Sequence, residues 1–135
     1  MSNKVVRVIL ETRLKAWADA QVPKVPIAFE GTPFSKPAAS AYLEPVLIPN
    51  VTINNELSGQ RKTHLGMFEV RCWYPSGRGM GGVEQLANNV INLFPILPKT
   101  GSVSIENTPY AEQSQIDDAG WIIVPVIILY RYEAA

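Results

Sequence analysis

Apolar residues recur at helical spacing in two segments of the chain. In residues 4–20 they fall on one side of a helix and charged residues on the other; the apolar set is Val6, Ile9, Leu10, Leu14 and Trp17. The second stripe follows a glycine-rich stretch and ends at prolines; it comprises Val83, Leu86, Ala87, Val90, Ile91 and Phe94. The pattern predicts two amphipathic helices, each with one face for a core.

Alternating polar and apolar positions predict strands between and after these helices. Residues 41–48 form the first, in which Pro45 lacks a ladder donor and therefore indicates a sheet edge or a bulge. Residues 63–74 alternate without a fully polar side, and residues 103–106 alternate with one apolar side. We expect three strands from these segments.

The last strand, residues 121–130, is apolar at both parities, as expected for a strand buried on both faces. The polar stretch 111–120 before it predicts a turn at Asp117–Gly120. Residues 49–62 are rich in Asn, Ser and Gly and predict a long loop or a loose hairpin tip. The proline-rich stretch up to Pro37 predicts a surface connector, with a short extended piece around residues 27–29.

Together these elements predict a single α+β domain over residues 1–135, with a mainly antiparallel sheet of four to five strands and two helices packed on one face. The other face would carry Leu65, Met67, Trp73 and one parity of the last strand. An apolar patch of this kind is larger than monomers usually expose. We therefore expect another copy of the chain to cover it.

Composition excludes several classes of function. The 135 residues hold 12 basic and 12 acidic side chains, so no net field attracts nucleic acid. No apolar run is long enough to suggest a membrane span. The charged N-terminal pattern does not resemble a secretory signal, and we expect the protein to stay, at least initially, in the cell that makes it.

Residues that commonly carry chemistry are sparse. Cys72 is the only cysteine and lies in mid-strand with Phe68 and Val70, where a thiol acts as a small core residue. His64 is the only histidine and has no carboxylate at metal-ligand spacing, which favours a surface or strand-end position. We expect no catalytic residue, no metal and no cofactor.

The segment Gly77-x-Gly79-x-x-Gly82 matches a dinucleotide-binding pattern between a strand and a helix, with Glu106 near the position of a ribose-binding acid. However, the chain has no second mononucleotide-binding half, and Pro75 and Ser76 separate the strand from the glycines. A flexible strand-to-helix connection is the favoured interpretation, and nucleotide binding is the alternative.

Charged residues at the predicted loops are candidates for protein contact. Arg61 and Lys62 lie opposite Glu56 in the long loop and are too few to form a nucleic-acid site. Asp117 and Asp118 are adjacent carboxylates, more typical of a solvated turn than of a cation site. The candidate protein interface therefore comprises Glu56, Arg61, Lys62, Leu65, Met67, Trp73, Asp117 and Asp118.

The order of motifs along residues 4–132 resembles the tail-terminator family of long-tailed phages, the small proteins similar to the lambda-type terminator. The motifs are the N-terminal amphipathic helix, the proline-rich run from Ile27 to Phe34, the strand from Ala41 to Pro49, the segment from Gly66 to Gly79, a helix closing on Phe94-Pro95, and a final strand from Trp121 to Tyr132.

This resemblance implies a virion structural protein of α+β fold, with no catalytic residues, that forms a homohexameric ring. Such a ring sits on the last ring of tail-tube protein, ends tube polymerisation and presents a surface to the head-tail connector protein. The resemblance thus implies a protein made in the host cytoplasm and placed in the virion at the tail end nearest the head. A neighbouring head-to-tail joining protein of similar size is an alternative role. We expect no membrane partner and no sequence-specific nucleic-acid partner.

Overall fold

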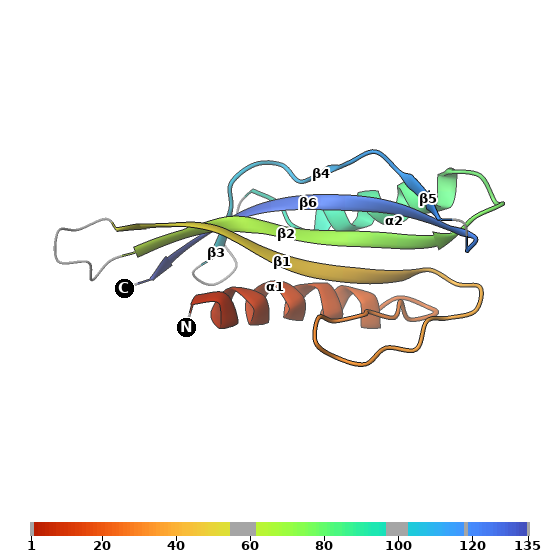
Figure 1. Ribbon diagram of the computed structural model, residues 1–135, viewed down its shortest axis with the longest axis horizontal. Helices are drawn as coiled ribbons and strands as arrows, with labels where there is room; N and C mark the ends of the chain where they lie inside the picture. The colour runs from red at the N-terminus through yellow and green to blue at the C-terminus, as the bar shows by residue number, and fades with distance from the viewer. Residues whose placement is uncertain (1, 55–61, 97–102, 118, 135) are drawn as a thin grey trace.

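The computed structural model describes residues 2–54, 62–96, 103–117 and 119–134 (Figure 1). Their elements are α1 (Ser2–Asp19), β1 (Tyr42–Asn54), β2 (Lys62–Pro75), α2 (Gly81–Leu93), β3 (Val103–Ile105), β4 (Tyr110–Ala111), β5 (Gln115–Asp117) and β6 (Trp121–Ala134). Within these ranges the strands form one six-stranded sheet in the order β1-β2-β6-β3, with β4 and β5 also paired to β6. The described ladders between strands are antiparallel, which confirms the α+β class but with more strands than the four to five predicted.

Both α1 and α2 pack on the same face of the sheet, as predicted. In Figure 1, α1 runs along β1 and α2 lies behind β6. The buried stripe of α1 is Val6, Leu10 and Leu14, and that of α2 is Val83, Leu86, Ala87 and Val90. These side chains meet Phe68, Val70, Cys72, Val124, Val126 and Ile128 of the sheet in one hydrophobic core. Packing of apolar stripes against one apolar sheet face is therefore what holds the domain together.

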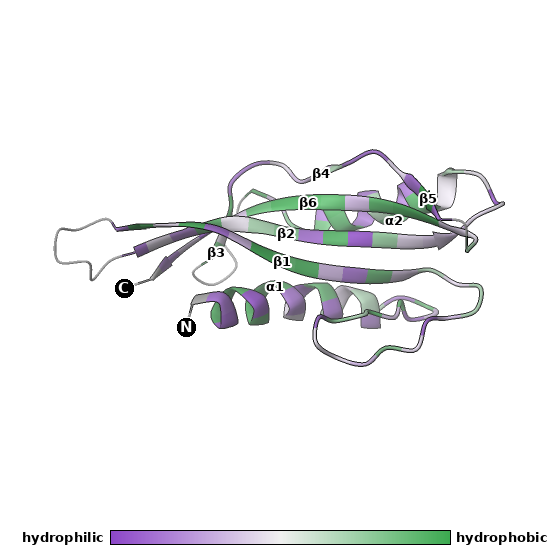
Figure 2. Ribbon diagram, viewed as in Figure 1, coloured by the Kyte–Doolittle hydropathy of each residue, from purple (hydrophilic) through white to green (hydrophobic). Residues whose placement is uncertain are grey.

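Strand β6 occupies the centre of the sheet, between β2 and the shorter strands (Figure 1). Val124 and Ile128 face the helices and are at most 5% exposed, while Ile127 on the opposite parity is 3% exposed. The hydropathy colouring of Figure 2 shows the long apolar run of this strand. The prediction that it is buried on both faces is confirmed at Ile127, whereas Ile123 and Leu129 of the same parity are half-buried.

Strand β1 extends farther than its pattern indicated. The prediction ended it at residue 48 and assigned 49–62 to a long loop or a loose hairpin tip. The loop prediction is wrong up to Asn54, because β1 continues to pair with β2 beyond Pro49 as one arm of a hairpin. A register shift between Pro49 and Val51 accommodates one extra residue, so the ladder resumes after the proline. Residues 55–61 lie outside the described residues. Pro45 lies on the edge strand, as predicted.

The polar stretch before β6 contains strands that its composition did not predict. Tyr110 and Ala111 pair with Ile127 and Val126, and Gln115–Asp117 pairs with Ile123–Trp121. These strands are short and mostly exposed, so they carry little apolar patterning. The predicted turn follows them, with the Gly120 N–H donating to the Asp117 carbonyl at 3.0 Å.

The glycine segment is a strand-to-helix connection. Gly77 and Gly79 have φ angles of 91° and 77°, a backbone conformation that favours glycine. Gly82 lies against the ring of Tyr74, where a Cβ atom would collide with the ring. A dinucleotide-binding unit joins neighbouring parallel strands. Here α2 leads from β2 to β3, and β6 lies between these two strands and is antiparallel to both. The glycines therefore serve the turn and the close helix-sheet contact.

Candidate protein interface

The sheet face that points away from α1 and α2, here called the outer face, carries no helix among the described elements (Figure 1). Alternation along β2 places Leu65, Met67 and Trp73 on it, as predicted, and all three are half-buried. The register brings Ile48 of β1 beside Met67 and Leu129 of β6 beside it on the other side. The outer face thus combines side chains from β1, β2 and β6.

An aromatic cluster occupies one end of the outer face. The rings of Tyr42 and Trp73 are stacked at 5.3 Å between centroids, and Trp121 meets Tyr42 edge-on at 5.3 Å. Phe34 of the connector lies 5.1 Å from Tyr42. The Lys36 ammonium lies 5.3 Å from the ring centroid of Trp73 and 5.5 Å from that of Trp121. The connector before β1 therefore covers this end.

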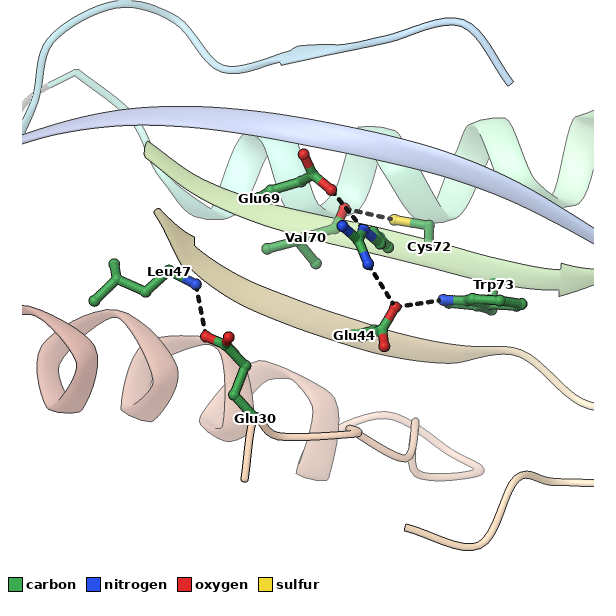
Figure 3. A network of polar contacts seen from close by, with 8 residues as sticks. Glu30, Glu44, Leu47, Glu69, Val70, Cys72 and Trp73 are labelled. Atoms are coloured by element: carbon green, nitrogen blue, oxygen red, sulfur yellow. Dashed lines mark hydrogen bonds and ion pairs between the residues drawn. The ribbon is translucent and has the colours of Figure 1, made fainter. Parts of the chain in front are cut away.

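A polar group lies in the middle of the outer face (Figure 3). Arg71 forms ion pairs with Glu69 on its own strand and with Glu44 on β1, the latter at 3.4 Å. The Trp73 indole N–H donates to the same Glu44 carboxylate at 3.2 Å. The hydrogen bond to Glu69 raises the pKa of the Arg71 guanidinium, so the group stays charged. These contacts join β1 and β2 and separate the aromatic cluster from the rest of the face.

Beyond the polar group the outer face is apolar and hollowed. A cavity of about 590 Å³ opens here, and its apolar lining includes Ile48, Pro49, Leu65, Met67 and Leu129. Ile48 is 38% exposed, and Val51 and Ile53 farther along β1 are 46% and 45% exposed. This hollow is a candidate site for an apolar side chain from another protein surface.

The free edge of β1 is closed near the hollow by the connector. The Leu47 N–H donates to the Glu30 carboxylate at 2.8 Å (Figure 3). Arg7 of α1 donates to the same carboxylate at 2.7 Å. Burial alone would raise the pKa of Glu30, but these two hydrogen bonds outweigh it and hold the pKa below its ordinary value. Glu30 therefore links α1, the connector and the sheet edge.

Two of the other predicted interface residues lie at opposite ends of the sheet, and Asp117 shares the face of its ladder partner Trp121 at the aromatic end. Lys62 is exposed at the start of β2, and Asp117 belongs to β5 at the opposite end of the sheet. Glu56, Arg61 and Asp118 lie outside the described residues. A role in protein contact for each of these residues stays a prediction.

Sequence reasoning missed several members of the outer face. Tyr42, Glu44 and Ile48 share one parity of β1, and this alternation could have assigned them to the face once β1 was paired with β2. Lys36 had no such signal, because its contact with Trp73 and Trp121 joins residues far apart in the chain.

Neither of the two residues considered for chemistry lies in a reactive setting. Cys72 is buried, and burial raises the pKa of its thiol to about 12. The His64 Nδ1 atom lies 2.9 Å from the Thr52 hydroxyl on the neighbouring strand. Within the described ranges no cluster of His, Cys, Asp and Glu could hold a metal ion. No described helix is long and apolar enough to cross a membrane.

Comparisons with known proteins agree with this architecture. A solved structure is similar with a TM-score of 0.79 and 31% sequence identity, over 98% of this chain and 96% of that chain. No curated protein matches the sequence. The profile of a family described as phage tail terminator protein matches residues 5–130, which span both helices and nearly all of the sheet. The chain belongs to the phage tail terminator protein family.

Proposed function

We propose that the protein assembles into a homohexameric ring that caps the phage tail tube, ends its polymerisation and forms the surface to which the head connector attaches. Membership of its family gives the protein a structural role in phage tail assembly and makes it a component of the virion.

The single observation that carries the proposal is the outer face of the sheet. It presents a hollow lined by Ile48, Leu65 and Met67, with no described helix over it. A ring requires a heterologous contact, in which one surface of a subunit meets a different surface of the next. An apolar hollow with a polar border fits the core and rim of such a contact. In the ring, this face receives the neighbouring subunit.

The end of the β1-β2 hairpin would then contact the tube. In Figure 1 the ends of β1 and β2 extend beyond α1. Lys62 is exposed at this end of β2. Glu56 and Arg61, the other candidate interface residues of this region, belong to the connection between β1 and β2. Charged residues of this kind steer a subunit onto a partner surface and discriminate between partners.

The proposal is tested by purified tail-tube protein polymerised with and without this protein, with tube length and tube ends measured by electron microscopy. The wild-type protein should shorten the tubes and place a ring at their ends. Ile48→Asp introduces a charge into the hollow and should abolish both the ring, measured by light scattering in the presence of tubes, and the capping. Ile116→Asp is the matched control, since Ile116 is 76% exposed on β5 and outside the hollow.

A second pair of variants separates the ring from the tube contact. Arg61→Glu with Lys62→Glu should leave the ring intact and reduce capping, because the charge at the hairpin end is reversed. Capping by Ile48→Asp at the wild-type level would contradict the role of the outer face. Unchanged capping by the double variant would remove the hairpin from the proposal.

A further inference from the structure

Strand β1 forms one edge of the sheet, and some of its backbone groups point away from β2. The Leu43 N–H donates to the Pro26 carbonyl at 3.0 Å, and the Leu43 carbonyl accepts from the Ala28 N–H at 2.8 Å. In an antiparallel ladder, successive residues alternate between the two sides of a strand. Odd-numbered residues from Leu43 to Pro49 therefore direct their backbone groups outward.

Every outward donor in this first half of β1 is paired or missing. Leu43 pairs with the connector, and the Leu47 N–H is bound by the Glu30 carboxylate at 2.8 Å. Pro45 and Pro49 have no N–H to offer. Prolines and charged groups on an edge strand prevent it from pairing with other chains. The first half of the edge is therefore closed to another strand.

Along the second half of the same edge, no described segment pairs with β1 on its outward side. The register shift between Pro49 and Val51 pairs Thr52 with His64 and Asn54 with Lys62, so that these even-numbered residues now point outward. Apart from the ladder with β2, no backbone hydrogen bond joins Thr52 to a described residue. All residues of Asn50–Asn54 are exposed. The bulge thus marks the boundary between a closed edge and an available one.

The sequence of this edge segment is nearly symmetric about Thr52. Asn50-Val51-Thr52-Ile53-Asn54 is almost the same when read in reverse. Antiparallel pairing of two copies about Thr52 would place Val51 opposite Ile53 and Asn50 opposite Asn54. β-branched pairs directly across an antiparallel ladder are favourable, and the asparagine amides can hydrogen-bond to one another. No charge opposes the pairing, since the segment has none.

We propose that Asn50–Asn54 is a strand-pairing site for a second copy of this chain, in which the two segments pair antiparallel about a two-fold axis at Thr52. Each Thr52 donates its N–H to the carbonyl of the other, and the two sheets become continuous. The contact is isologous and cannot by itself close a ring. It is therefore distinct from the lateral ring contact of the proposed function and does not depend on it.

Thr52→Pro removes the one outward N–H at the centre of the pairing and leaves the β1-β2 ladder intact, because that N–H does not face β2. Thr52→Val is the matched control, since it also lacks the hydroxyl that contacts His64 but keeps the N–H. Sedimentation velocity over a range of concentrations should show a dimer for wild type and Thr52→Val. For Thr52→Pro the dimer dissociation constant should rise about tenfold or more, because two hydrogen bonds are lost. Equal association of all three proteins would overturn the proposal.

Disulfide formation tests the register directly. Thr52→Cys should form a covalent dimer on mild oxidation, since facing residues in such a ladder lie within disulfide reach. Asn50→Cys and Asn54→Cys should each form no disulfide-linked dimer alone and should crosslink when mixed, because residue 50 of one copy faces residue 54 of the other. The native Cys72 is buried and does not interfere. Crosslinking of Thr52→Cys no faster than that of Ile116→Cys, an exposed control, would overturn the proposal, as would crosslinking of Asn50→Cys alone.

Discussion

The two faces of the sheet differ in what covers them. On the helix side, Phe68, Val70 and Cys72 of β2 are fully buried beneath α1 and α2. On the outer face, Met67, Glu69 and Arg71 of the same strand are half-buried and are joined by ion pairs or line a hollow. Alternation along one strand thus serves folding on one side and, in the proposed function, contact with other proteins on the other. Apolar character alone does not distinguish the two uses.

Truncation of neighbouring residues on β2 should separate the faces most strongly. Phe68→Ala removes a buried ring that lies edge-on to Phe94, and it should destabilise the fold by about 3–5 kcal/mol. Met67→Ala on the outer face should cost about 1 kcal/mol, because the side chain is already half-exposed. Urea unfolding monitored by circular dichroism measures both. Equal losses would mean that the outer face contributes to folding as much as the core does.

The next largest difference in stability should be between substitutions at two glycines that begin α2, because only one of them contacts the sheet. Gly82→Ala should destabilise by about 1–3 kcal/mol, since the new methyl group collides with the Tyr74 ring. Gly81→Ala places the same methyl group where no atom lies within 4 Å, and it should stabilise by up to about 1 kcal/mol through helix propensity. Thermal unfolding of the two variants should therefore give shifts of opposite sign. A stabilised Gly82→Ala would contradict the close contact.

Removal of the Lys36 side chain, which covers the aromatic cluster, should have a smaller effect on the free energy of unfolding. Lys36→Ala removes the cation over Trp73 and Trp121 and should cost about 1 kcal/mol, a value typical of partly exposed cation-ring contacts. Lys24→Ala, a change at an exposed lysine of the same connector, is the control and should be nearly neutral. Denaturant unfolding of both proteins tests the difference. Identical stabilities would mean that Lys36 does not hold the connector on the outer face.

The smallest effect is a difference in pH dependence between two carboxylates that bind Arg7. Hydrogen bonds lower the pKa of Glu30 despite its burial, so its contribution is present above the ordinary value of 4.5 and is lost as pH falls through the lowered pKa. Burial raises the pKa of Glu11 despite Arg7, so its contribution is present below 4.5 and is lost as pH rises through the raised pKa.

As pH rises, wild type should therefore gain stability relative to Glu30→Gln and lose stability relative to Glu11→Gln. Unfolding free energies measured at pH values on both sides of 4.5 give the two slopes. Slopes of the same sign would contradict the assigned environments.

Much of the helix side could be predicted from the sequence. The stripes of α1 and α2 and the alternation of β2 each repeat with one period, so local pattern and final burial agree. The end of β1 could not be predicted, because Pro49 and Asn50 are typical of loops and the register shift that accommodates them depends on pairing with β2. β4 and β5 are held by β6 rather than by their own apolar residues.

The candidate interface was predicted in part. Leu65, Met67 and Trp73 followed from parity, because an uncovered face can be counted from strands and helices. The polar group of Glu44 and Arg71 and the cover by Lys36 depend on cross-strand register and on the path of the connector, which no single segment encodes.

The cation that Lys36 places between Trp73 and Trp121 gives the molecule an optical signal of its own. Indole emission responds to nearby charge and to water, and these two indoles share the outer face, whereas Trp17 packs against the core on the opposite side. A shift in intrinsic fluorescence on mixing with tubes would therefore report movement of the connector without any attached dye. Replacement of Trp17 by phenylalanine would leave only the two reporting indoles.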